Sequence, residues 1–338
     1  MNINGHLNLN GSQGYFWQDP QIHTPAPGGP GGFDGGLGGF YEPATGGNTT
    51  GFPGIGPGGG AASPPGGIPG DRDGFHATHY ELYNNSSLQA ISGGSGGGGT
   101  ATTFFSESNE WGRGGNGGGG GGAVLIASSR DIWVNGKITA MGGEGGFETY
   151  KRPNQNPQTT FPRGGSGSGG SIRLVADRVF VSSASSFDVS ATINNSHDRD
   201  DVPENKGRIR IEAVYHDITW AAAFGNEHYS VTEPKTTLFE PNIPTLEINS
   251  IAGQNVSINP SSDPAAPEVT FSSAGPVTIV VSAENVPDGS AISLRVTSGS
   301  AIVTATPQTL TGGAANFSVT VPAGSGVVQA WTDWEVTP

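Results

Sequence analysis

Short apolar runs alternate with blocks of glycine along the first two thirds of the chain. Residues 114–122 are glycines around a single asparagine, and the apolar runs 123–127 and 132–134 follow within a few positions. The pair Asn135-Gly136 then precedes a further run at 137–141. Short apolar runs bounded by glycine are typical of buried strands, and Asn-Gly predicts a narrow turn with two positive φ values. The pattern predicts strands joined by tight turns and no helix.

The same arrangement recurs along the sequence. Further copies lie at residues 164–176, at 208–213 and, in part, at 3–9, which matches 134–140. Ala123 and Ser171, which open two of the copies, are 48 residues apart. Repeats of this size indicate units that bury their apolar face only by stacking on neighbours. Short strands stacked in layers of about 4.8 Å predict a parallel β-solenoid.

A long insertion, residues 21–110, interrupts the predicted solenoid. Its part from 21 to 74 is rich in Gly and Pro, which fits either a disordered linker or glycine runs packed as extended threefold helices. Apolar residues that punctuate these runs favour ordered packing against the solenoid. They are Phe33, Leu37, Phe40, Phe52 and Ile55. Two polar loops, 150–162 and 194–206, are expected to project from the stack.

Composition changes near residue 241, where glycine blocks stop and short alternating strands begin. The predicted strands are 246–248, 256–258, 269–271, 277–281, 292–296, 302–304, 316–321 and 327–330. Closely spaced short strands separated by turn residues predict an antiparallel Ig-like β-sandwich. The sequence thus predicts an all-β protein with a glycine-rich solenoid domain at 1–240 and a sandwich domain at 243–338.

Charge and cysteine content narrow the possible partners and location. The chain has 338 residues with a formal net charge of −14 at pH 7, which argues against nucleic acid and anionic membranes as partners. No cysteine is present, so disulfides, thiolate metal sites and a cysteine nucleophile are excluded. No apolar run is long enough to span a bilayer, and no signal peptide is visible. An extracellular or cell-surface location is expected, either after removal of an upstream part or through delivery without a signal peptide.

Candidate metal ligands are few. His76 and His79 form the only close histidine pair, in no helical context, and the ordinary interpretation is that both are solvated polar residues at the surface. Asp71 and Asp73 partly resemble a calcium loop, but the glycine comes too early. The acidic run 197–201 offers a second possible Ca²⁺ site or simply a solvated face. No cofactor is predicted, and a metal site is left open.

Catalytic signatures are weaker still. Residues 93–97 match the letters of a nucleophile elbow, but no helix follows them. No carboxylate pair for glycoside cleavage can be assigned, although some solenoids act on polysaccharides. The six tryptophans are scattered along the sequence. Core packing is the more common role of such residues, and stacking on a sugar is the alternative. No catalytic residue is predicted.

With these residues in view, the chain resembles bacterial secreted and surface proteins of a glycine-rich repeat type. The resemblance is carried by residues 122–127, 132–138 and 169–176, each beside a glycine block. It implies a structural or adhesive role outside the cell and brings no catalytic residues. A weaker likeness is to phage tail-tip adhesins with polyglycine helices.

The expected function is a self-assembling subunit of a surface fibre or adhesive layer. An unpaired strand edge near the N-terminus, with asparagines at positions 2, 4, 8 and 10 and no charge, favours pairing with another chain, for instance with the sandwich domain of a neighbour. The alternatives are an adhesin that binds a polysaccharide or surface receptor, and a solenoid enzyme that degrades polysaccharide.

Overall fold

The computed structural model describes the chain in ranges separated by gaps. The described residues are 1–14, 24–39, 41–42, 47–48, 51–60, 62, 88, 91–100, 114–146, 164–191, 206–218, 228–233, 242, 244–257, 260, 267–273, 275–298 and 301–332. These residues form strands and connecting segments and no helix, which confirms the all-β prediction. The chain divides into two compact units, Met1–Leu238 (unit 1) and Phe239–Pro338 (unit 2).

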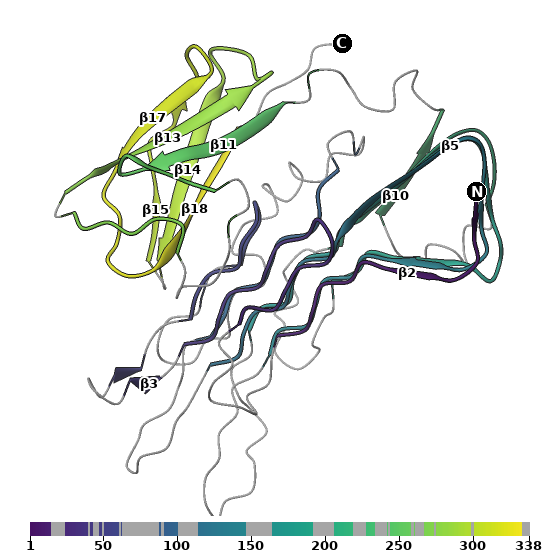
Figure 1. The fold of residues 1–338 in the computed structure, drawn as a ribbon, viewed down its shortest axis with the longest axis horizontal. Helices are drawn as coiled ribbons and strands as arrows, with labels where there is room; N and C mark the ends of the chain where they lie inside the picture. Colours follow the sequence, from purple (N-terminus) through teal and green to yellow (C-terminus); the bar gives the residue numbers. More distant parts are fainter. Residues whose placement is uncertain are drawn as a thin grey trace, which may run out of the picture. The chain divides into compact units, whose positions relative to one another are not determined.

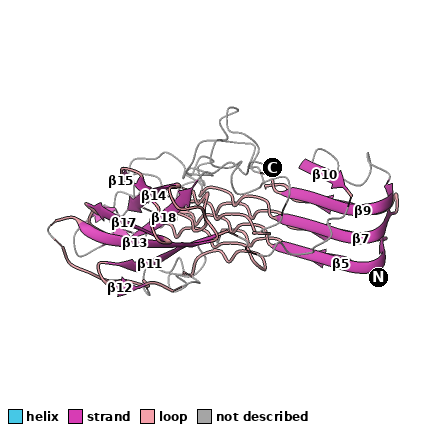
Figure 2. Ribbon diagram, turned by 90° about the horizontal axis from the view of Figure 1, so that it is seen from above, coloured by secondary structure: helices cyan, strands magenta, loops and turns pink. Residues whose placement is uncertain are grey.

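Unit 1 contains a five-stranded sheet in which every pairing is parallel. Its strands, in sheet order, are β1 (Asn2–Ile3), β5 (Ala123–Val134), β7 (Ser171–Val181), β9 (Arg208–Ile218) and β10 (His228–Thr232). Ala123 pairs with Ser171, and Ser171 pairs with Arg208, so the sequence repeats are neighbours in the sheet as predicted. Figure 2 shows β5, β7 and β9 side by side.

A second parallel sheet follows the first in each of three copies. It is built from β2 (His6–Asn8), β6 (Lys137–Thr139) and β8 (Ser186–Asp188), in that order. Ile3 pairs with Val134 in the first sheet, and Leu7 pairs with Ile138 in the second. These registers confirm that residues 3–9 are a partial copy of residues 134–140.

The predicted narrow turn at Asn135-Gly136 is wrong, because neither residue has a positive φ. β5 and β6, on either side of the pair, do not pair with each other; each joins its own parallel sheet. The chain therefore turns a corner between sheets instead of reversing direction. A Cβ at Gly136 would lie 2.0 Å from the carbonyl oxygen of Gly5, so the close stacking of corners requires glycine here.

The apolar side chains of these strands form one continuous cluster. In β7, Ile172, Leu174, Val179 and Val181 all face it and are buried. Beside the register shift between Ser128 and Asp131 in β5, the inward residues of β7 change from 172, 174 and 176 to 179 and 181, so the inward set of β7 is not a simple alternation. Each strand contributes only a few apolar side chains, and the neighbouring strands supply the rest of the core.

Residues 114–122 lie at the centre of a bundle of glycine-rich segments, drawn as wavy traces in Figure 1. Three neighbouring segments accept its N–H groups: 9–14, 33–39 and 164–170. Three others donate N–H groups to its carbonyls: 24–29, 91–100 and 140–146. The donors to one neighbour are three residues apart, as are Gly114, Gly117 and Gly120, which donate to residues 39, 36 and 33. The segment is therefore hydrogen-bonded to six neighbours with a threefold period.

Side chains would not fit between these segments. A Cβ at Gly117 would lie 1.9 Å from the carbonyl oxygen of Gly97, and one at Gly118 would lie 2.0 Å from that of Gly143. Both distances are far shorter than any van der Waals contact between carbon and oxygen. The runs of glycine are therefore a packing requirement of the bundle rather than a sign of a flexible linker.

The apolar residues of the 21–110 region were predicted to pack against the solenoid, but the described ones do not join the hydrophobic cluster of the sheets. Leu37 and Ile55 are buried, and Phe33 and Phe52 are half-buried, yet none belongs to the hydrophobic cluster of the sheets. Phe40 lies outside the described residues. The bundle is instead connected by backbone hydrogen bonds, with a small hairpin of β3 (Tyr41–Glu42) and β4 (Gly47–Asn48) also present in this region.

Unit 2 consists of antiparallel strands in two sheets. One sheet has the order β12 (Gln254–Asn255), β11 (Thr245–Ile251), β13 (Val277–Glu284), β17 (Ala314–Val319). In the other, β14 (Ala291–Ser298) pairs with β15 (Ala301–Thr304), β16 (Gln308–Thr309) and β18 (Gly326–Thr332). Alternate residues of β13 and β17 are buried, among them Ile279 and Phe317, in one hydrophobic cluster.

Two of the strands predicted for unit 2 differ in the structure: one has other bounds, and the other does not form. At 256–258 the predicted strand begins too late, because a turn with positive φ at Ala252 and Gly253 brings β12 into pairing at Gln254–Asn255. Residues 269–271 join no sheet; the carbonyl of Thr270 accepts a hydrogen bond from the Gln254 side chain at 2.7 Å. The apolar and polar residues alternate at 269–271, but no strand among the described residues pairs with them.

The glycine bundle makes a direct prediction for Gly118→Ala. The new methyl group would overlap the Gly143 carbonyl, so the bundle must open or lose hydrogen bonds. Overpacking of this kind costs about 1–3 kcal/mol. We expect the midpoint of thermal unfolding, measured by calorimetry, to fall by several degrees.

Gly5→Ala is the matched control in the same unit. Nothing lies within 4 Å of a Cβ at Gly5, so its effect on the free energy of unfolding should stay within about 0.5 kcal/mol. Equal midpoints for the two variants would show that the bundle does not need close backbone approach.

Candidate functional site

After the register shift between Ser128 and Asp131, which is a bulge of one residue in β5, the long strands of unit 1 carry aligned side chains on their outer face. Trp133 of β5 pairs in register with Phe180 of β7, and Asp131 pairs with Arg178. Tyr215 of β9 lies opposite Arg178. Trp133 is 41% exposed and Tyr215 is 53% exposed, so large rings stand at the surface of three successive strands. We call Trp133, Phe180 and Tyr215 the aromatic ladder.

The rings of the ladder contact one another. The Trp133 and Phe180 ring centroids are 3.9 Å apart with planes 11° from parallel, and those of Phe180 and Tyr215 are 5.8 Å apart and tilted by 50°. Stacking of in-register rings stabilises neighbouring strands beyond the area that they bury. The tilt of Tyr215 leaves part of its ring face uncovered by Phe180.

A charged pair borders the ladder. The Arg178 guanidinium donates to both carboxylate oxygens of Asp131, at 2.7 Å and 2.9 Å, and lies 5.9 Å from the Phe180 ring centroid. The hydrogen bond to Asp131 is the main cause that raises the pKa of Arg178 above its ordinary value. The surface thus combines exposed rings with polar groups held in fixed positions, a combination suited to ligands that have both apolar faces and hydroxyl groups.

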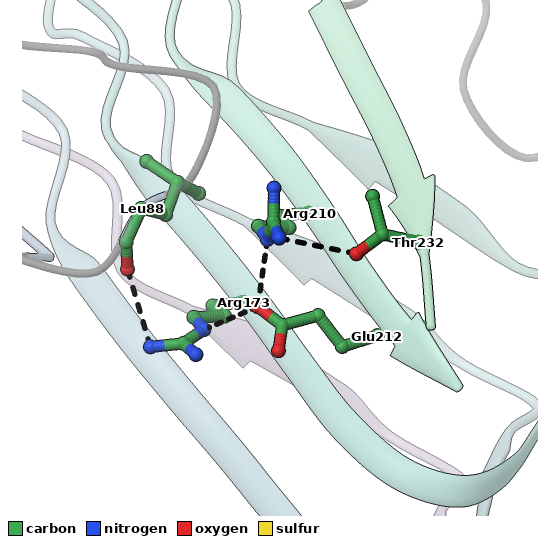
Figure 3. A network of polar contacts seen from close by, with 5 residues as sticks. All are labelled: Leu88, Arg173, Arg210, Glu212 and Thr232. Atoms are coloured by element: carbon green, nitrogen blue, oxygen red, sulfur yellow. Dashed lines mark hydrogen bonds and ion pairs between the residues drawn. The ribbon is translucent and has the colours of Figure 1, made fainter. Parts of the chain in front are cut away.

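On the same sheet, nearer the glycine bundle, lies a buried ionic cluster (Figure 3). Arg173 and Arg210 both donate to the same carboxylate oxygen, Oε1 of Glu212, at 3.0 Å and 2.6 Å. Arg173 and Glu212 are each only 1% exposed. Arg173 also donates to the Leu88 carbonyl at 3.4 Å, and Arg210 donates to the Thr232 hydroxyl at 3.1 Å.

The cluster joins segments that are far apart in the sequence. Arg173 belongs to β7, Arg210 and Glu212 to β9 and Thr232 to β10, while Leu88 lies in the region between two glycine segments. Burial tends to raise the pKa of Glu212, but hydrogen bonds from the two arginines outweigh it and lower that pKa below its ordinary value. A buried carboxylate held ionised by two arginines fixes three strands and Leu88 in one arrangement.

The candidate metal ligands chosen from the sequence cannot be compared with these side chains. Asp71, Asp73, His76, His79 and the acidic run 197–201 all lie outside the described residues. Among the residues that the structure describes, no group of three or more His, Cys, Asp or Glu side chains is placed to hold a metal ion. Residues 93–97 belong to the glycine bundle, where Gly94 and Gly97 donate to the segment 114–122. The described part of the chain likewise contains no helix long and apolar enough to cross a membrane.

The sequence pattern gives Trp133 only as one of six scattered tryptophans and does not connect it with Phe180 and Tyr215. Ala123 pairs with the residue 48 positions on, whereas Trp133 pairs with the residue 47 positions on, because β5 has an extra residue at its bulge. A fixed offset of 48 therefore aligns Trp133 with the wrong residue. An alignment of the two copies that allowed one insertion between Ser128 and Asp131 would have found the stack.

Comparisons with known proteins add no relative. No protein-family model, no curated protein and no solved structure matches this chain. The resemblance to glycine-rich repeat surface proteins stays a prediction from sequence.

The ionic cluster predicts an acid-sensitive contribution to stability. Because the folded pKa of Glu212 is lowered, its contribution is complete above the unfolded pKa of about 4.3 and is lost as pH falls through the folded pKa. Glu212→Gln leaves two buried arginines without a countercharge, which costs about 3–5 kcal/mol near pH 7. Urea unfolding from pH 7 to pH 3 should show the difference between wild type and variant narrowing as pH falls.

Asp131→Asn serves as the comparison, since it removes the carboxylate of the exposed Arg178 pair. We expect a smaller loss of stability at pH 7 than for Glu212→Gln, because solvent screens the exposed pair. A Glu212→Gln difference that is independent of pH would contradict the assignment.

Proposed function

We propose that the protein is an extracellular structural protein, a self-assembling subunit of a surface fibre or adhesive layer. In this proposal residues 1–240 form a parallel β-solenoid with a polyglycine bundle, and residues 243–338 form an Ig-like sandwich. The observation that carries the proposal is the hydrogen bonding of residues 114–122 to six neighbouring segments. Such a core is built from backbone alone and suits a rigid scaffold.

The threefold period supports packing of the polyglycine II type. An extended helix with three residues per turn directs successive N–H groups to three different sides, so each neighbour receives a hydrogen bond from every third residue. Donation from Gly118 and Gly121 to residues 165 and 168 follows this rule in parallel, and donation from Gly119 and Gly122 to residues 12 and 9 follows it in antiparallel. Weak Cα–H···O contacts between such helices add to the packing.

The stacked sheets support the solenoid part of the proposal. The five-stranded and the three-stranded sheet of unit 1 are parallel, and their copies follow the same order, β1–β5–β7 in the first and β2–β6–β8 in the second. After β1 and β2, and again after β5 and β6, the chain has passed through both sheets before it enters a glycine-rich segment. Layers of this kind end in strands with one described neighbour, which favours addition of strands from other chains.

Assembly is tested by electron microscopy and sedimentation of concentrated protein that keeps its N-terminus. We expect fibres or a continuous growth in size with concentration, because a head-to-tail contact need not close. A monodisperse monomer at every concentration would refute a self-assembling subunit.

The aromatic ladder favours a second candidate function, an adhesin that binds polysaccharide. Trp133 and Tyr215 expose ring surface beside the Arg178–Asp131 pair, and sugars present apolar ring faces together with hydroxyl groups. An uncharged sugar would also not be repelled by the protein, whose net charge is −14. A fixed surface on a rigid stack would bind with little loss of side-chain entropy.

We expect Trp133→Ala and Tyr215→Ala each to weaken retention in affinity electrophoresis on a panel of neutral polysaccharides by roughly 2- to 10-fold, since one ring contributes about 0.5–1.5 kcal/mol. Val214→Ala is the control, because Val214 is 68% exposed on β9 but lies outside the ladder. Equal retention of all three variants would remove the ladder as a binding surface.

The same panel separates a binding protein from an enzyme. Incubation of the wild-type protein with each polysaccharide, followed by assay of reducing ends and unsaturated products, should show no turnover. Any product formed in proportion to protein concentration would favour the solenoid enzyme instead.

A further inference from the structure

Asparagine is followed by glycine at four positions of the sequence, and the structure gives these pairs different surroundings. The four asparagines are Asn4, Asn10, Asn116 and Asn135. In such a pair the glycine nitrogen can attack the side-chain carbonyl carbon of the asparagine, because glycine has no side chain that hinders the approach. The attack needs a glycine nitrogen that is not held in a hydrogen bond and an asparagine side chain that solvent reaches.

The second and third of these pairs are held in the glycine bundle. The Gly11 N–H donates to the Met141 carbonyl at 2.8 Å, and the Gly117 N–H donates to the Gly36 carbonyl at 2.7 Å. The asparagine side chain before each of these glycines also accepts a hydrogen bond from a backbone N–H, at 2.9 Å and 2.8 Å. Neither glycine nitrogen is free to attack until the bundle opens locally, so both asparagines are protected.

Asn135 and Gly136 lie outside the bundle, at the corner between β5 and β6, and this corner has a described layer on each side. Asn135 is exposed and Gly136 is half-buried. Among the described residues, none accepts a hydrogen bond from the Gly136 N–H, and only the Gly136 carbonyl is used, by the Ser186 N–H at 3.3 Å. The next layer has a longer corner, since β7 ends at Val181 and β8 begins at Ser186, so its backbone does not continue the hydrogen-bond ladder at Gly136.

We propose that Asn135 is a site of spontaneous deamidation, whether or not the chain assembles. The Gly136 nitrogen loses its proton to solvent and forms a bond to the side-chain carbonyl carbon of Asn135. The bond from that carbon to Nδ2 breaks, and Nδ2 takes up a proton from water and leaves as ammonia. Water then opens the cyclic imide at one of its two carbonyl groups, which gives aspartate or isoaspartate.

The conversion loosens the stacking of two corners. The Asn135 Nδ2 group donates to the side-chain oxygen of Asn4 at 3.0 Å, and loss of the amide removes this donor. Isoaspartate also lengthens the backbone at a place without room for it, because a Cβ at Gly136 would lie 2.0 Å from the Gly5 carbonyl oxygen. The layer of β1 and β2 is therefore held less tightly against β5 and β6 in converted molecules.

Incubation of the folded protein at mildly alkaline pH, followed by peptide mapping with mass spectrometry, measures the conversion of each asparagine. We expect Asn135 to convert at least about tenfold faster than Asn10 and Asn116, whose glycine nitrogens must first leave a hydrogen bond in a packed segment. The same chain unfolded in guanidinium chloride is the matched control. Glycine follows each of the three asparagines, so without the fold their rates should become similar.

A folded protein in which Asn135 converts no faster than Asn10 and Asn116 would overturn the assignment. Ion exchange separates the converted protein, which carries an additional negative charge, and peptide mapping verifies that the change is at Asn135. We expect its midpoint of thermal unfolding to lie a few degrees below that of unconverted protein, as loss of a hydrogen bond predicts. Equal midpoints would overturn the loosening of the corners.

Discussion

The structure of unit 1 depends on hydrogen bonds between backbones that approach each other without side chains between them. The segment 114–122 satisfies most of its N–H and C=O groups through six different neighbours, which allows a segment with no strand partner to be buried. This arrangement requires glycine, because a Cβ at most of these positions would overlap a carbonyl oxygen. Glycine loses more conformational entropy on folding than other residues, and hydrogen bonds to neighbours on several sides offset that cost.

The few polar residues within the glycine segments follow the same constraint. The Thr100 hydroxyl accepts from the Gly115 N–H at 2.8 Å, and the Ser95 hydroxyl accepts from the Gly58 N–H at 2.9 Å. The Asn116 side chain accepts from the Gly38 N–H at 2.8 Å and donates to the Thr24 carbonyl at 3.0 Å. A side chain is tolerated where its own oxygen replaces a carbonyl as acceptor, so these residues extend the backbone network.

Bundle and sheets determine each other's register. Segment 114–122 runs directly into β5 and segment 164–170 into β7, and Gly118 and Gly121 of the first donate to residues 165 and 168 of the second. The same alignment continues as the pairing of Ala123 with Ser171. A slip of one residue in the sheet would move the apolar side chains to the outer face and break the threefold hydrogen bonding together. The ionic cluster around Glu212 adds a further constraint, which joins β7 to β9 and β10.

The sequence alone determined the strand class, the repeat and the in-register pairing, because glycine blocks and apolar runs recur with a spacing that survives in the layers. The positions of Ala123, Ser171 and Arg208 followed from this pattern. The corner at Asn135-Gly136 was decided by tertiary structure, since the same dipeptide suits a hairpin when the flanking strands pair with each other and a corner when they do not. The aromatic ladder and the Arg173–Glu212–Arg210 cluster also depend on tertiary structure. A bulge of one residue changes the offset for Trp133, and the charge of Glu212 is stable in the interior only because Arg210 of its own strand and Arg173 of the neighbouring strand lie beside it.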